Sequence, residues 1–112
     1  MRRLTLGVAL LACSVIAHAY DWPLTIPSDA QAQHYILEIG GTWPGRTAIT
    51  RRTSASGTHY AKRFYDCLNH TVKFLGAGAT LDAMAQSKPD EDMAPVAPGS
   101  VADYVEREAC KR

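Results

Sequence analysis

Residues 47–67 read TAITRRTSASGTHYAKRFYDC, a stretch with the pattern of two strands joined by a turn. Residues 47–53 predict a strand anchored by Ile49, whose otherwise polar composition is typical of an edge strand. Residues 54–57 carry serine and glycine, which favour a turn. Residues 58–67 predict a second strand, so the stretch as a whole indicates an antiparallel hairpin.

The second strand of this hairpin has two chemically different faces. Side chains two residues apart share a face of a strand. Tyr60 and Phe64 are therefore expected on one face, and Ala61, Tyr65 and Cys67 on the other.

The regions flanking the hairpin extend the predicted sheet. Residues 34–39, HYILEI, are rich in β-branched and aromatic residues and precede two glycines, which predicts a strand before the hairpin. Residues 71–75, TVKFL, predict a strand after it. Residues 20–33 contain two prolines and read as an extended lead-in. The chain is thus expected to form about four antiparallel strands in a meander.

Two short helices are expected after the sheet, separated by a Pro-rich loop over residues 87–99. Thr80 is a candidate N-cap for a helix to about residue 86, and Ser100 is one for a helix that carries Cys110 in its last turn. The fold class is therefore α+β. The predicted buried stripes are Leu81, Met84 and Ala85 in the first helix and Val101, Tyr104 and Val105 in the second.

Residues 1–19, MRRLTLGVALLACSVIAHA, have the features of an export signal: two arginines, an apolar stretch and a small-x-small cleavage site. We expect residues 20–112 to form one small domain in the periplasm or outside the cell, with no membrane-spanning segment. The tetrapeptide at 10–13, LLAC, resembles a bacterial lipobox. It leaves open a small envelope lipoprotein acylated at Cys13, which would carry a lipid anchor.

Cys67 and Cys110 are the only cysteines beyond the predicted signal. In an oxidising compartment two thiols allow a single pairing, so we expect a disulfide that joins the terminal helix to the sheet. Free or catalytic thiols are the alternative. A zinc site is disfavoured because the two cysteines stand far apart in the sequence.

The charge and motif content of the chain disfavour several classes of function. Without Arg2 and Arg3, the 12 basic residues fall to ten against 11 acidic ones, which does not suggest nucleic-acid binding. Hydrolase, phosphate-loop and dinucleotide motifs are missing from the sequence, and His34, His59 and His70 lack the spacing of a metal pair. We therefore expect a non-enzymatic binding or envelope-interaction protein without cofactor or metal.

The region between Glu38 and Asp66 contains no acidic residue and several basic ones. Solvated strand faces would explain such a run, but it is also where a protein or envelope component is most readily expected to bind. The candidate partner-binding residues are Arg46, Arg51, Arg52, Ser56, His59, Tyr60, Lys62 and Arg63.

Most of the region after the signal resembles small exported bacterial proteins related to the surface-adhesin protein E type. The resemblance is carried by Asp66-Cys67 at a strand end, residues 73–76 (KFLG), residues 98–100 (PGS) and Ala109-Cys110. It implies a small disulfide-clamped α+β domain at the bacterial envelope. Adhesins of that kind bind host matrix proteins.

A second resemblance is local. Residues 54–60, SASGTHY, are similar to the Ser-Gly-x-x-Tyr loop of C-type lysozyme inhibitors, onto which Ser56 and Tyr60 would map. Those inhibitors carry a Trp-x-Lys-Gly stretch soon afterwards, where this chain has FYDC at 64–67. The resemblance implies periplasmic lysozyme inhibition as an alternative function.

Overall fold

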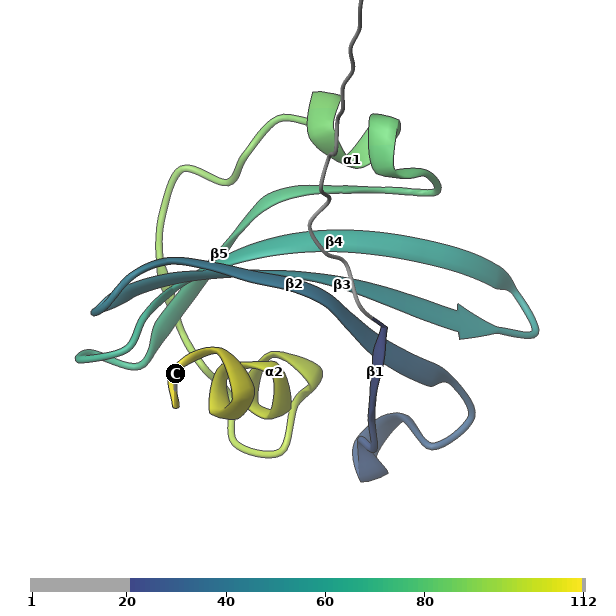
Figure 1. Ribbon diagram of the computed structural model, residues 1–112, viewed down its shortest axis with the longest axis horizontal. Coiled ribbons are helices and arrows are strands. Elements are labelled where there is room, and N and C mark those ends of the chain that lie inside the picture. Colours follow the sequence, from purple (N-terminus) through teal and green to yellow (C-terminus); the bar gives the residue numbers. More distant parts are fainter. Residues whose placement is uncertain (1–20, 112) are drawn as a thin grey trace, which may run out of the picture.

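The computed structural model describes residues 21–111, in which six strands form one antiparallel sheet (Figure 1). The strands follow one another across the sheet in chain order, so the predicted meander and α+β class are confirmed. The elements are β1 (Trp22–Leu24), a 3-10 turn η1 (Pro27–Asp29), β2 (Gln33–Thr42), β3 (Gly45–Ser54), β4 (Gly57–Asp66), β5 (Thr71–Gly78), α1 (Leu81–Gln86), β6 (Ala94–Pro95) and α2 (Val101–Ala109).

The hairpin of β3 and β4 is the longest regular unit and pairs without interruption from Ser54 opposite Gly57 to Gly45 opposite Asp66. The predicted alternation along β4 is confirmed, since Ala61 and Tyr65 are buried. The expectation that β3 lies at an edge is wrong, because β2 pairs along its other side. Its buried residues are Ala48 and Thr50, and its other side chains remain partly exposed although the strand lies in the middle of the sheet.

The sheet is larger than the sequence indicated. β2 continues through Gly40 and Gly41, beyond the expected end of the strand, to a turn at Trp43 and Pro44 whose peptide bond is cis. The lead-in contains β1, which pairs with β2, and the Pro-rich loop contains β6, which pairs with β5. Both added strands are two or three residues long and cover the edges of the meander.

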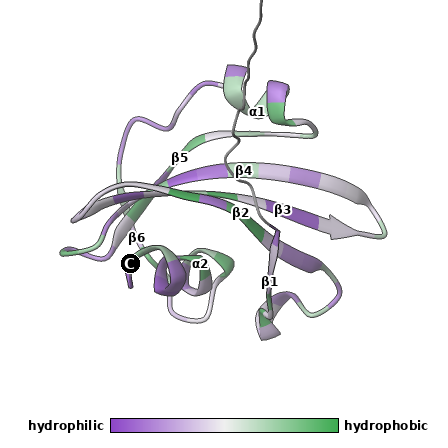
Figure 2. Cartoon of the chain, viewed as in Figure 1, coloured by the Kyte–Doolittle hydropathy of each residue, from purple (hydrophilic) through white to green (hydrophobic). Residues whose placement is uncertain are grey.

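The two helices lie on opposite faces of the sheet (Figure 1). On the α1 face, Gly76 of β5 approaches the backbone of Met84 so closely that any side chain there would collide with the helix. On the α2 face, the hydroxyl of Tyr65 donates a hydrogen bond of 2.8 Å to the carbonyl of Ala102. Figure 2 shows apolar segments both on the strands and on α2.

The core lies between α2 and the sheet and is closed by the disulfide between Cys67 and Cys110, as predicted. Tyr65 is fully buried there, because its ring lies beneath the helix while its hydroxyl remains hydrogen bonded. The buried members of this core are Ala48, Tyr65, Cys67, Val105 and Ala109.

Both predicted N-caps are confirmed. Thr80 accepts a hydrogen bond from the backbone of Ala83, and Ser100 accepts one from the backbone of Asp103. The expected stripe of α1 is partly wrong: Met84 is buried, but Leu81, the first residue of a helix of only six residues, is 48% exposed. Ala85 is exposed as well.

The predicted signal at residues 1–19, with its cleavage site and Cys13, lies outside the described residues. No helix within residues 21–111 is long and apolar enough to span a bilayer.

Candidate functional site

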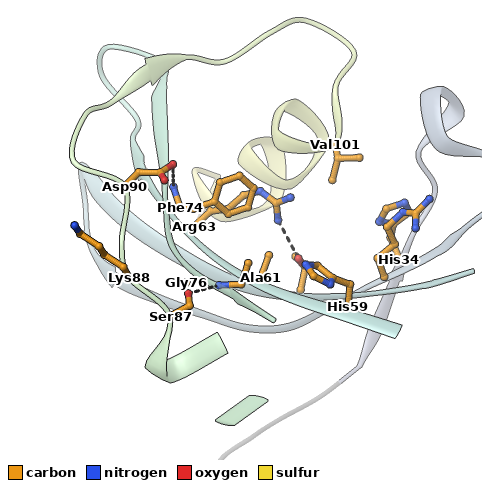
Figure 3. A pocket seen from close by; sticks show the side chains of 13 residues that line it. His34, His59, Ala61, Arg63, Phe74, Gly76, Ser87, Lys88, Asp90 and Val101 are labelled. Carbon is orange, nitrogen blue, oxygen red and sulfur yellow. Dashed lines mark hydrogen bonds between the residues drawn. The ribbon is translucent and has the colours of Figure 1, made fainter. Parts of the chain in front are cut away.

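A cavity of about 320 Å³ opens on the α2 face of the sheet, beside the first turn of the helix (Figure 3). Its floor is formed by β3, β4 and β5, and Val101 at the start of α2 contributes to its wall. Residues after α1, among them Lys88 and Asp90, form the rim. Pockets of this size are large enough for a small organic ligand.

The sequence creates this cavity through small residues and a short helix. α2 covers the disulfide end of the face and begins at Val101, so the remainder of the face has no helix above it. Ala61 and Ala77, which lie opposite each other on β4 and β5, have small side chains that leave room over the strands. A bulge in the pairing of β4 with β5 sets Phe74 directly opposite Arg63, which brings the aromatic ring beside the guanidinium.

Arg63 is the central polar group of the cavity (Figure 3). The residue is only 9% exposed, its Nη1 donates a hydrogen bond of 2.9 Å to Thr50 Oγ1, and its guanidinium lies 4.9 Å from the centre of the Phe74 ring. Within residues 21–111 no carboxylate forms an ion pair with it. Burial therefore lowers the pKa of Arg63 below its ordinary value, yet a guanidinium remains charged at neutral pH.

A second charged group borders the cavity and is internally balanced. Arg52 donates to both carboxylate oxygens of Asp29, at 2.7 and 3.1 Å, and His34 Nε2 lies 2.8 Å from the same carboxylate. The hydrogen bond from Arg52 and the contact with His34 lower the pKa of Asp29 to about 2. The Asp29 carboxylate thus neutralises Arg52, whereas Arg63 has no such partner among the described residues.

Three hydrogen bonds attach the rim to the backbone of β5. The amide of Asp90 donates to the carbonyl of Phe74 at 2.9 Å, and the amide of Phe74 donates to the Asp90 carboxylate at 3.3 Å. Ser87 Oγ accepts a hydrogen bond of 2.8 Å from the amide of Ala77. The rim is therefore held in place although Lys88 and Asp90 are themselves exposed.

The predicted partner-binding residues do not form one continuous basic patch. Arg52, His59 and Arg63 line the cavity, with His59 exposed at its opening. Side-chain alternation and the pairing of Arg51 with Tyr60 place these two residues on the opposite face, as alternation does for Lys62.

The remaining two candidates lie at the ends of the hairpin. Arg46 donates to the carbonyls of Gly41 and Ala109, which fixes it against the end of α2. Ser56 occupies the exposed turn, where its hydroxyl contacts that of Ser54 at 2.9 Å.

Sequence reasoning did not identify Thr50, Phe74 or Asp29 as neighbours of these residues. The pairing of Thr50 with Ala61 could have been read from the hairpin register, but the bulge that moves Phe74 beside Arg63 has no evident sequence signal. Asp66 does not pair with the neighbouring basic side chains; it accepts hydrogen bonds from the turn that follows β4. No cluster of three metal-ligating side chains occurs in the described part of the chain.

Comparison of the chain with models of protein families, with curated proteins and with solved structures gives no match. The resemblances to surface-adhesin protein E and to C-type lysozyme inhibitors therefore rest on the residues quoted for them.

Proposed function

We propose that the chain is an exported, non-enzymatic binding protein whose cavity on the α2 face holds a small anionic ligand. The observation that carries this proposal is Arg63: a buried cation that lines the cavity and has no carboxylate partner among the described residues. The ligand's anionic group would be that partner.

Burying the charge of Arg63 has an energetic cost. Removing a charged side chain from water costs several kcal/mol unless a counter-charge and hydrogen bonds replace the solvent. A guanidinium has five N–H donors, and the contact with Thr50 uses one of them. The planar arrangement of the remaining donors suits an oxyanion, which a guanidinium can bind through two parallel hydrogen bonds.

The arrangement of acid and base groups supports binding rather than catalysis. His34 and Asp29 are in contact with each other, and Arg52 holds the carboxylate in its ionised form. A carboxyl group with a pKa near 2 is a weak base at neutral pH. His59 is exposed at the opening of the cavity and is not paired with a second acid or base within the described residues.

The proposed location in the periplasm or outside the cell is supported by the signal-like residues 1–19 and only weakly by the disulfide. Mass spectrometry of the intact protein purified from the expressing cell tests it. A chain beginning at Tyr20 supports a secreted form, and an acylated Cys13 as first residue supports the envelope lipoprotein. An uncleaved, unmodified chain would contradict both.

Anion binding can be tested by NMR spectroscopy of a nitrogen-labelled sample, in which the Nε–H resonance of Arg63 is followed during titration with benzoate. We expect saturable shifts in that resonance and in the amides of the cavity floor. The variant Arg63→Met should lose the response of the floor amides. Arg51→Met, which removes a cation from the opposite face, should retain it, and equal responses in both variants would contradict the proposal.

Lysozyme inhibition is a second candidate function. It is supported by the turn between β3 and β4, which extends beyond α2 (Figure 1) and exposes Ser56. Tyr60 follows on the α1 face of the same hairpin. If this candidate is right, the purified protein inhibits a C-type lysozyme, and the double variant Ser56→Ala and Tyr60→Ala abolishes the inhibition. Inhibition that persists in the double variant would exclude this loop as its cause.

A further inference from the structure

We infer that the cavity selects an amphipathic monocarboxylate, with its carboxylate on Arg63 and a compact apolar body over Phe74 and the floor, an inference that rests on the proposed function. The charge, lining and size of the cavity each support one part of it.

The charge balance of the lining favours a single negative charge. Arg52 is neutralised by Asp29, and the exposed rim carries Lys88 and Asp90, which have opposite signs. Arg63 is therefore the one buried cation of the lining without a counter-charge among the described residues. A second negative charge on the ligand would lose its hydration without gaining a partner, and this disfavours phosphate and dicarboxylates.

The lining next to Arg63 favours an apolar body. Phe74 is 41% exposed although its ring faces the cavity, and Ala61, Ala77 and Val101 add further apolar surface. A ligand that covers this surface gains free energy in proportion to the apolar area it removes from water. The ring of Phe74 and the guanidinium of Arg63 are adjacent, so the two ends of an amphipathic ligand can be satisfied together.

The volume of the cavity limits the size of the ligand. The cavity holds about 320 Å³, and because one water molecule takes about 30 Å³ of liquid, this corresponds to roughly ten non-hydrogen atoms. Linear and aromatic acids both satisfy this limit. Octanoate lies at this size and 4-phenylbutyrate slightly above it, so the two acids probe a linear and an aromatic body near the limit.

The experiment compares the affinities of five probes, measured by NMR titration of the nitrogen-labelled protein comprising residues 20–112. The probes are octanoate, 4-phenylbutyrate, neutral octanamide, the dianion suberate, and inorganic phosphate. We expect at least one monocarboxylate to bind tenfold or more tightly than octanamide, suberate and phosphate. Arg63→Met should reduce its affinity at least tenfold. Ala61→Leu, which fills the floor, should also reduce it, and Arg51→Met on the opposite face should leave it unchanged.

The outcomes separate this inference from the proposed function. Binding of phosphate or suberate as tight as that of the monocarboxylates would overturn the inference and leave the anion-binding function intact. Equal binding of octanamide and octanoate would overturn both, because the charge would then have no role. A folded protein that binds none of the five probes would also overturn both.

Discussion

Replacing Arg63 with methionine should leave the ligand-free protein at least as stable as the original, although it removes two contacts. The variant loses the hydrogen bond to Thr50, worth about 1 kcal/mol, and the stacking on Phe74, worth about 1–2 kcal/mol. It also avoids burying an unpaired charge, which costs several kcal/mol. Methionine restores part of the contact with the ring through its sulfur. The net expectation is a change between about zero and 2 kcal/mol in favour of the variant.

Urea unfolding of the oxidised protein in ligand-free buffer measures this difference. The double variant Arg63→Met with Thr50→Val should be about 1 kcal/mol more stable than Arg63→Met alone, because it removes the hydroxyl left without its donor. Arg51→Met is the matched control: it breaks an ion pair of 2.9 Å with Asp21 at the surface and should cost no more than about 1 kcal/mol. A measurable loss of stability in Arg63→Met would contradict this expectation, and a loss of more than about 2 kcal/mol would identify Arg63 as a structural residue.

Three further predictions concern the fold. Replacing Cys67 and Cys110 together by alanine should lower the free energy of unfolding by up to about 4 kcal/mol, the chain-entropy value for a separation of 43 residues, as measured by urea unfolding with and without reductant. The pKa of Asp29 is lowered from 3.8 to about 2, so its stabilising effect is complete above pH 4 and is lost as the pH falls towards 2; Asp29→Asn should reduce the dependence of the urea midpoint on pH in that interval. Gly76→Ala should destabilise the protein by more than about 1 kcal/mol in the same assay, because the added methyl group collides with the backbone of α1.

The parts of the fold that depend on local sequence were predictable. The β3–β4 hairpin follows from alternation around a Ser-Gly turn, and the caps at Thr80 and Ser100 are satisfied within three residues of the cap itself. The disulfide follows from the pairing of two cysteines in an oxidising compartment. Each of these predictions needs information only from neighbouring residues or from a single pair.

The parts that were missed depend on contacts distant in the sequence. β6 is two residues long and forms because Val72 of β5 offers a free edge, which the local composition of a Pro-rich loop does not reveal. β3 is a polar strand, and its central position is set by a partner strand that continues through two glycines. The site was only partly predictable: Arg63 was identified as a candidate, but its burial results from the bulge opposite Phe74 and from the rim that follows α1.

The disulfide and the cavity are connected through α2, which offers a physical reason for their presence in one small domain. Cys110 at the end of the helix is bonded to Cys67, the carbonyl of Ala102 holds Tyr65, and Val101 at the start of the helix forms part of the cavity wall. The stabilisation expected from the covalent bond is of the same order as the cost of a buried, unpaired charge. The disulfide at one end of the helix therefore offsets, in the free energy of unfolding, the cost of the buried charge at the other end, and a folded wall beside Arg63 would suit the ligand that we propose.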